Sequence, residues 1–321
     1  MRHPWHRRAS SAGAALAIDR ALGELPLPGR LHPVALFGTA MTALERRVYD
    51  DRSAPGALLA AAGVGLAGAA GAAVGSPVVG GYVSTAGRGL HTAALRVAAA
   101  LDAGDATTAR GLLPSLVGRN PNALDEAGIA RAAVESVAEN TTDAIVAPAL
   151  WTAAAGSVGA FVHRAGDTLD SMVGYRDDRY RRFGLASARL DDALAWVPAR
   201  VTAVLVVLAR PRHAPAIARA VRRDAPRHPS PNAGVAEAAF AAALGLRLGG
   251  VNRYGDVVES RPILGTGRAP VPYDITAAVE LSRHVTWLLA GLLVLAGSAG
   301  GMARRSGVDA ALAPGREGGR S

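Results

Sequence analysis

Four stretches with few or no charges limit the fold of this chain more than any other feature of its sequence. They cover residues 57–80, 143–163, 193–209 and 285–303. A helix needs roughly 20 apolar residues to cross a bilayer, and the first and last stretches meet this length well. The second stretch contains Pro148, and the third is short and contains Arg200. We therefore predict a membrane protein whose helices enter the bilayer more than once.

Helical periodicity dominates the rest of the sequence, and polar turns separate the helices. Alternating β-branched runs are rare, so we expect an all-α, polytopic helical membrane protein whose polar loops carry the motifs. No solenoid repeat or long linker divides the chain. We expect a single membrane domain over residues 1–303 and a disordered C-terminal tail over residues 304–321.

Charge and composition narrow the possible functions. The net charge is +9, almost all of it from arginine, and there is no cysteine. Thiolate metal sites and cysteine nucleophiles are excluded, and the positive charge suits contact with membrane lipid or phosphorylated substrates. A soluble nucleic-acid binder fits poorly, because only 4% of the residues are aromatic and the apolar runs are too long. The sequence contains no Walker loop, GxSxG elbow or HExxH motif.

The segment ESVAENTTD places three acidic residues directly before the second apolar stretch. In a helix, Arg131, Glu135 and Glu139 form one stripe, which Asp143 continues. The stripe can be an Arg–Glu ladder on a solvated face, or it can be a cation site, because two carboxylates one turn apart can hold Mg²⁺. Asn140 could add a neutral ligand or bind a substrate amide.

Two further segments combine acids with arginines. GDTLDSMVGYRDDRYRRFG joins Asp167 and Asp170 to arginines that begin at Arg176. These arginines could lie on anionic headgroups, or one of them could bind a phosphate or carboxylate with two hydrogen bonds. SARLDDALAWVPAR places Asp192 and Arg200 on one helical flank. An arginine inside an apolar stretch indicates either a functional group or, here, a structural ion pair with Asp192.

Asn232 directly precedes another predicted helix, AGVAEAAFAAALGL. We expect its side chain to cap that helix. A phosphate or substrate carboxylate bound at the helix N-terminus is the functional alternative. The eight histidines are scattered without the spacing of metal ligands.

Taken in order, these segments resemble the CobD/CbiB family of cobalamin biosynthesis proteins, the membrane-bound adenosylcobinamide-phosphate synthases. The resemblance runs from about Asp19 to Gly265 and includes HPVALFG near its start. ARAAVESVAENTTDAIVAP is similar to the family's central ESxAENxxD block. DTLDSMVGYRDDRYRRFGLASARLDDALAWVPAR resembles its longest signature, and SPNAGVAEAAFAAALGLRLGG its last. The chain departs from the family pattern at Asn120, Asp167 and Ala195.

The resemblance implies a ligase of vitamin B12 synthesis. Such an enzyme joins the propionate carboxylate of (adenosyl)cobyric acid to aminopropanol or its O-phosphate, with ATP and Mg²⁺. On this scheme the expected catalytic residues are Glu135, Glu139, Asp170, Asp191 and Asp192. The expected Mg²⁺ ligands are Glu135, Glu139 and Asp143. The expected substrate-binding residues are Asn140, Arg176, Arg189, Arg200 and Asn232.

The implied location is the cell (inner) membrane, with several passes and lipid as a constant partner. Because no ATP motif is recognisable, a partner subunit or a second copy could supply the nucleotide site. One alternative function stays open. A transporter or sensor that binds a corrinoid or phosphorylated ligand without chemistry would explain the apolar stretches and Arg200 equally well.

The second apolar stretch poses a topological problem. If residues 144–162 cross the membrane completely, ESVAEN and DTLDS lie on opposite sides and cannot share a nucleotide site. Either this segment re-enters or is buried as a helix broken near Pro148, or only one of the two blocks is catalytic; we favour the re-entrant or buried segment. Such backbone is tolerated in a membrane when protein encloses it.

Overall fold

The computed structural model describes residues 5–25, 27–117, 124–254 and 257–312. Within these ranges the regular secondary structure is helical apart from one β-hairpin and an isolated β-bridge between Leu246 and Arg268. Four helical segments are long and apolar enough to cross a membrane: Ser53–Val74, Glu126–Val173, Leu185–Ala209 and Pro272–Ala299. They overlap the four apolar stretches of the sequence, and the predicted polytopic helical architecture is confirmed.

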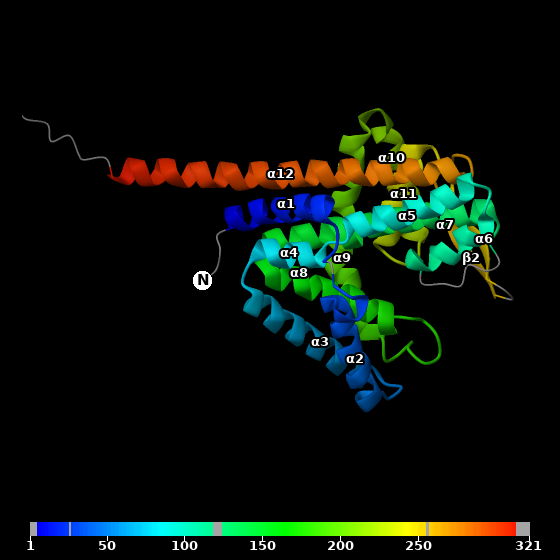
Figure 1. The fold of residues 1–321 in the computed structure, drawn as a ribbon, viewed down its shortest axis with the longest axis horizontal. Coiled ribbons are helices and arrows are strands. Elements are labelled where there is room, and N and C mark those ends of the chain that lie inside the picture. Colours follow the sequence, from blue (N-terminus) through cyan, green and yellow to red (C-terminus); the bar gives the residue numbers. More distant parts are fainter. Residues whose placement is uncertain (1–4, 26, 118–123, 255–256, 313–321) are drawn as a thin grey trace, which may run out of the picture.

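Several helices follow the long axis of the molecule (Figure 1). The N-terminal helix α1 (Trp5–Leu22) packs along α12 (Pro272–Leu312), and α4 (Pro77–Ser84) and α8 (Ala147–Val173) pack against α1. Helix α12 continues past residue 303, where the sequence predicted the start of a disordered tail, as far as Leu312. Residues 313–321 of that predicted tail lie outside the described residues.

The second apolar stretch forms a helical hairpin. Helix α7 (Glu126–Thr141) continues through a π-helical turn (Thr142–Val146) into α8, which reverses direction at Gly156. Gly156 has φ 67° and ψ −149°, a conformation open almost only to glycine. The two arms touch at the bend, because a Cβ added to Gly159 would lie 2.3 Å from the carbonyl oxygen of Trp151. The expected return of the chain is confirmed, although the break lies at Gly156 rather than near Pro148.

Small residues let neighbouring helices approach the bend of this hairpin. The hydroxyl of Ser157 donates a hydrogen bond of 2.7 Å to the carbonyl oxygen of Gly71 in α3 (Ser53–Val74). A Cβ added to Gly80 of α4 would lie 2.4 Å from the Cβ of Ser157. The close helix contacts that small residues permit in lipid therefore gather around one end of the hairpin.

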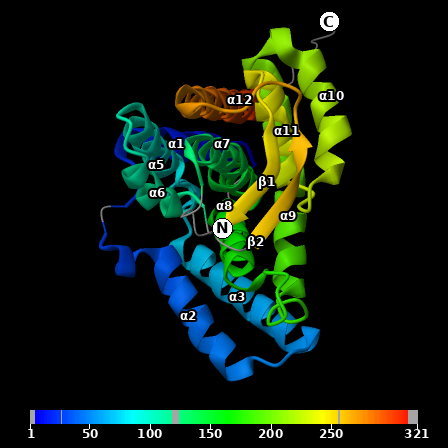
Figure 2. The ribbon, with the colours of Figure 1, turned by 90° about the vertical axis from the view of Figure 1, so that its right-hand side faces the viewer.

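Helix α9 (Leu185–Ala209) runs across the direction of α12 and α8 (Figures 1 and 2). It contacts α8, α11, α3 and α12. Beyond it, one end of the molecule holds α5 (Gly87–Asp102), α6 (Ala106–Leu112), α10 (Ala214–Asp224) and α11 (Ala233–Leu244). Helix α2 (Pro33–Val48) precedes α3. Four short 3₁₀ turns complete the helical part: Gly29–Leu31, Leu113–Ser115, Pro211–His213 and Ala225–Arg227.

The one β-hairpin is an addition to the predicted all-α fold. Strands β1 (Leu248–Tyr254) and β2 (Val257–Leu264) pair antiparallel, with Leu248 opposite Leu264 and an irregularity before Gly250. The sequence GGVNRYGD predicted only a polar turn here, because two short strands with glycines lack an alternating apolar pattern. The hairpin contacts α10, α11 and α7, so it packs against the helices around the candidate site.

Candidate active site

The acidic segment ends in the π-helical turn, which neighbouring helices hold in place. The hydroxyl of Thr141 donates to the hydroxyl of Ser282 in α12 at 2.7 Å. The hydroxyl of Thr142 donates to that of Thr202 in α9 at 3.0 Å. Turns of this kind occur often at functional sites. Here the turn fixes the backbone around Asp143 between α9 and α12.

Six carboxylates from three segments converge beside this turn. The charge of Asp143 interacts with those of Glu139, Asp167 and Asp191. The charge of Asp191 also interacts with those of Asp170 and Asp192. The returning arm of α8 supplies two of the six, and the first half of α9 supplies two more. We call this set the acid cluster: Glu139, Asp143, Asp167, Asp170, Asp191 and Asp192.

Arginines offset part of this negative charge. Arg164 forms an ion pair of 3.0 Å with Asp167. Arg176 attracts Asp170 and Asp192, and Arg189 attracts Asp192. Half-buried like charges are costly unless protons or cations compensate them. The acid cluster is thus a place where a bound cation or an ammonium group is stabilised.

The chemistry of the donor set fits Mg²⁺, which prefers carboxylate oxygens and often bridges to phosphate. Within the described ranges, no three acidic or histidine side chains already surround a single metal position. Oxygen atoms of a bound phosphate or water would have to complete the coordination shell. The acid cluster therefore offers ligands of the right kind rather than a finished metal cage.

Glu135 lies apart from the acid cluster. Its carboxylate accepts a hydrogen bond of 2.7 Å from the backbone N–H of Gly249 in β1, and its charge interacts with that of Glu237 in α11. Glu139 interacts with both Glu237 and Asp143, so it lies between the two regions. The predicted Mg²⁺ ligands Glu135, Glu139 and Asp143 are thus spread over two turns and are not gathered at one point.

A cavity of about 1160 Å³ opens beside the acid cluster. It lies between α9, α10, the loop 174–184 and the segment that precedes α11. Its lining includes Arg176, Arg189, Asp192, Arg200 and His228. The three arginines predicted to bind substrate therefore line one cavity, and Asp192 connects that cavity with the acid cluster.

Asn232 holds Arg200 in this cavity and does not cap α11. Its side-chain oxygen accepts a hydrogen bond of 2.8 Å from Arg200, and its amide donates to the carbonyl oxygen of Asp192 at 2.8 Å. Asn232 occupies the N-cap position without a capping hydrogen bond, and the hydroxyl of Ser230 instead accepts from the backbone N–H of Ala233 at 3.2 Å. The predicted capping role of Asn232 is therefore wrong, because its side chain is engaged by α9.

Arg200 is fixed by further contacts within α9. It donates to the carbonyl oxygen of Trp196 at 3.0 Å, and its guanidinium lies over the Trp196 ring, 4.5 Å from the centroid. The predicted ion pair with Asp192 is replaced by the bridge through Asn232. Pro198 leaves the carbonyl of Leu194 without its helical donor, and the indole N–H of Trp151 donates to that oxygen at 2.9 Å.

Asn140 faces a different cavity from the arginines. Its amide donates to the carbonyl oxygen of Ser136 at 3.0 Å. The residue lines a smaller cavity of about 310 Å³ together with Glu24, Ser115 and Arg164. Of the predicted substrate-binding residues, Asn140 is thus the one that lies away from the large cavity.

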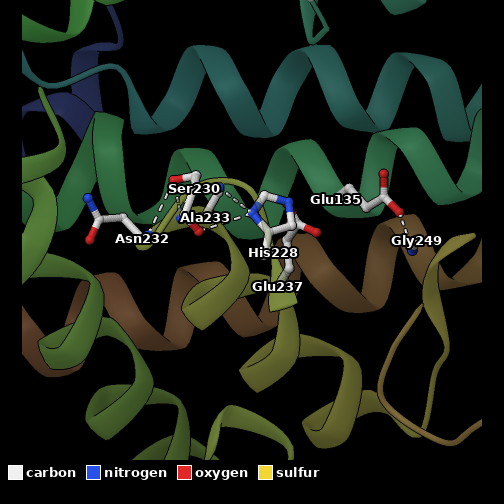
Figure 3. A network of polar contacts seen from close by, with 7 residues as sticks. All are labelled: Glu135, His228, Ser230, Asn232, Ala233, Glu237 and Gly249. Carbon is white, nitrogen blue, oxygen red and sulfur yellow. Dashed lines mark hydrogen bonds and ion pairs between the residues drawn. The ribbon is translucent and has the colours of Figure 1, made fainter. Parts of the chain in front are cut away.

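Two buried titratable residues were missed in the sequence (Figure 3). Glu237 of α11 is 1% exposed, and the imidazole Nε2 of His228 lies 3.7 Å from its carboxylate. Burial, together with the charges of Glu135 and Glu139, raises the pKa of Glu237 well above its usual range. Burial lowers the pKa of His228. The sequence held one signal for Glu237, which is the single acidic residue of an otherwise apolar predicted helix.

The three departures from the family pattern fall in different surroundings. Asp167 belongs to the acid cluster and pairs with Arg164. Ala195 is buried, with 1% of its surface exposed, inside α9. Asn120 lies outside the described residues.

Comparison with known proteins agrees with these motifs. The family model described as CobD/Cbib protein matches residues 12–282. The cobalamin biosynthesis protein CobD of Mycobacterium tuberculosis is 46% identical over 305 residues, which cover 91% of this chain and 96% of that protein. The proteins of the same name from Rhodobacter capsulatus and Chromobacterium violaceum are each 41% identical, over 88% of this chain and 94% of theirs. No solved structure matches the chain.

Proposed function

The chain belongs to the CobD/CbiB family of cobalamin biosynthesis proteins, and from this premise we propose that it forms an amide bond between a corrinoid carboxylate and an amino alcohol. The acid would be the propionate of (adenosyl)cobyric acid. The amine would be aminopropanol or its O-phosphate, and the product cobinamide or cobinamide phosphate. We place this reaction at the inner membrane.

One observation carries the proposal. The acid cluster and the arginine-lined cavity meet along α9, where Asp192 belongs to both. An amide synthase must bring together an anionic acid and a cationic amine. Arginines attract the former, and carboxylates attract the latter. A cavity of about 1160 Å³ also gives room for part of a large polycyclic substrate.

The carboxylate substrate needs activation, because its oxygen is a poor leaving group at neutral pH. ATP with Mg²⁺ would supply that activation by phosphoryl transfer. Glu139 and Asp143, with other members of the acid cluster, would hold the metal ion. Arg176, Arg189 and Arg200 would bind phosphate or carboxylate oxygens and stabilise the negative charge that develops on them.

The amine attacks only after its ammonium group has lost a proton. Asp170, Asp191 and Asp192 would hold this ammonium group, and one of them would accept the proton. The amide substituents of the corrin would bind to amide groups such as Asn140, whereas Asn232 acts through Arg200. Glu135 would act indirectly, since it is engaged with Gly249.

The test is product analysis with purified protein in detergent. Cobyric acid, Mg²⁺ and either aminopropanol or its O-phosphate would be incubated with and without ATP, and corrinoid products identified by mass spectrometry. We expect an amide product only with ATP, and the preferred amine identifies the physiological substrate. Corrinoid binding without amide formation under any condition would overturn the proposal in favour of a transporter or sensor.

A matched pair of variants tests the acid cluster. Glu139→Gln should lower turnover roughly 100-fold or more, because it removes one charge from the metal and phosphate site. Glu126→Gln at the exposed start of the same helix should leave turnover unchanged. Equal turnover of Glu139→Gln and the unaltered protein at saturating Mg²⁺ would exclude a metal role for Glu139.

A further inference from the structure

The orientation of α9 separates it from α12 and α8, whereas α3 runs obliquely to the long axis (Figures 1 and 2). Helix α12 and both arms of the hairpin in α8 follow the long axis of the molecule, whereas α9 runs across it (Figures 1 and 2). A bilayer that α12 crosses along its length would therefore have α9 lying in its plane. Length and composition alone do not distinguish these orientations, because α9 is 25 residues long and apolar enough to span.

The exposed side chains of α9 that lie outside the large cavity form one stripe. Positions 193, 196, 197 and 208 are exposed outside the large cavity, at helical spacings that keep them on the same side, whereas the exposed Leu185, Arg189 and Val204 line that cavity. The large members of this stripe are Trp196, Val197 and Leu208, which are 53–55% exposed. A helix that lies in the membrane interface presents such a stripe along its whole length, rather than an apolar surface all around.

The charge next to this stripe indicates what covers it. From the end of α9 through α10, residues 210–227, the exposed charged or titratable side chains are all basic. They are Arg212, His213, Arg219, Arg222, Arg223 and Arg227. The one acid in this segment, Asp224, is buried. Exposed arginines beside an apolar stripe complement a bilayer surface that carries anionic headgroups, at about 1 kcal/mol per basic residue.

We propose that α9 lies along the membrane surface, with its stripe in the lipid and the arginines of the α9–α10 region on anionic headgroups. Trp196 supports this placement, since tryptophan is enriched at the membrane–water interface. Arg200, stacked on Trp196, reaches from the same helix into the large cavity. The cavity would then open at the level of the headgroups. This inference does not depend on the proposed reaction.

Spin labels can measure the depth of α9 directly, because the chain has no native cysteine. Single cysteines would replace Ala193, Val197 and Leu208, which are exposed and do not line the large cavity. In vesicles with anionic lipid we expect all three labels within about 5 Å of one depth, near the headgroups. If α9 crosses the membrane, the depths of the labels at Ala193 and Leu208 would differ by roughly 20 Å, and the label at Val197 would lie between them. That result would overturn the proposal.

Controls and a lipid arm complete the test. Labels at Trp287 and Leu295 of α12 should differ in depth by about 12 Å, which shows that the method resolves a crossing helix. A fluorophore attached at Leu208 reports the neighbouring lipid through quenching by brominated anionic or brominated zwitterionic lipid. The double variant Arg212→Gln/Arg219→Gln should weaken its preference for the anionic lipid by up to about 5-fold for each arginine removed. An unchanged lipid preference would show that these arginines do not contact anionic headgroups and would overturn that part of the proposal. Short distances between Val197 labels on different molecules would make the stripe a protein–protein interface and overturn the proposal as well.

Discussion

At the scale of single residues, Asn232 sets the direction of Arg200. It accepts a hydrogen bond from the guanidinium and donates one to α9, so Asn232→Ala removes both. A hydrogen bond to a charged group contributes about 1.5–3 kcal/mol. We expect kcat/KM of the amide-forming reaction to fall roughly 10- to 100-fold, chiefly through KM. Ser230→Ala is the control, since it removes the hydroxyl that accepts from the backbone N–H groups of Asn232 and Ala233 but keeps the side-chain bridge from Asn232 to Arg200. Equal kinetic losses in the two variants would show that only helix stability matters.

Asp19 predicts a pH dependence of stability. It is 1% exposed, one carboxylate oxygen accepts the backbone N–H of Arg88 at 3.0 Å, and burial raises its pKa from 3.8 to about 6. The folded state therefore holds the proton more tightly than the unfolded state does. The resulting penalty is absent below pH 3.8, grows between pH 3.8 and 6, and above pH 6 is on the order of 3 kcal/mol.

The variant Asp19→Asn tests this penalty, because an amide oxygen can still accept the N–H of Arg88 without a charge. We expect its thermal unfolding midpoint to exceed that of the unaltered protein at pH 7.5. The difference should shrink at pH 4.5, where the native carboxyl is protonated. A gain of equal size at both pH values would mean that packing, not ionisation, is responsible.

The sequence indicated many of the residues that the structure brings together in the candidate site, but it could not indicate their partners. The acid cluster and the arginine-lined cavity contain most of the residues that the motifs indicated. Spacing could not show that Asn232 binds Arg200, because that contact joins positions 32 residues apart. Nor could it show that Ser230, two residues earlier, accepts the hydrogen bond from the backbone N–H of Ala233 instead. Glu237 was detectable in principle as the lone acid of an apolar helix.

At the scale of elements, the bend at Gly156 decides whether the acid cluster exists. Gly156→Ala forces a side chain into a backbone conformation that costs of order 1–3 kcal/mol or opens the hairpin. We expect a lower unfolding midpoint and a loss of turnover larger than the stability loss explains. Gly65→Ala in α3 is the control, because a Cβ there has open space around it and alanine favours the helix. Equal unfolding midpoints of Gly156→Ala and Gly65→Ala would contradict a special role of the bend at Gly156.

The helices themselves were predictable, because 3.6-residue periodicity and apolar length are local properties. The position of the bend was not. Pro148 looked like the natural break, but it lies in the first turn of α8, where proline is tolerated. Gly156 is one of two glycines in its stretch, with Gly159, and only the contact between the two arms of the hairpin shows where the chain bends. The direction of α9 was likewise hidden, since its length and apolar content resemble those of a crossing helix.

At the scale of the whole molecule, the fold resolves an ambiguity of the sequence about orientation. Arginines occur in every loop, so the positive-inside rule cannot be applied to the sequence alone. In the structure, the loop 174–184 and the basic segment 210–227 lie toward the end with the large cavity, and the start of α1 lies at the other (Figure 1). The bend at Gly156 lies beside that start of α1, because a Cβ added to Gly156 would lie 3.6 Å from the side chain of Arg8. An excess of arginine marks the cytoplasmic side. The cavity is therefore expected to face the cytoplasm, where ATP is present.

Cysteine labelling of vesicles tests this arrangement of the whole chain. Ala103, Asp178 and Arg212 are exposed positions toward the cavity end, and Arg7 and Ala155 are exposed toward the other. With one cysteine at a time, an impermeant maleimide should label the first three from the cytoplasmic side and the last two from the opposite side. Arg212 is decisive for α9, because a crossing α9 would move it away from Asp178. Labelling of Ala155 and Asp178 from the same side would instead mean that the hairpin is too shallow to reach the far surface, and the acid cluster would then lie at a different depth from the one inferred here.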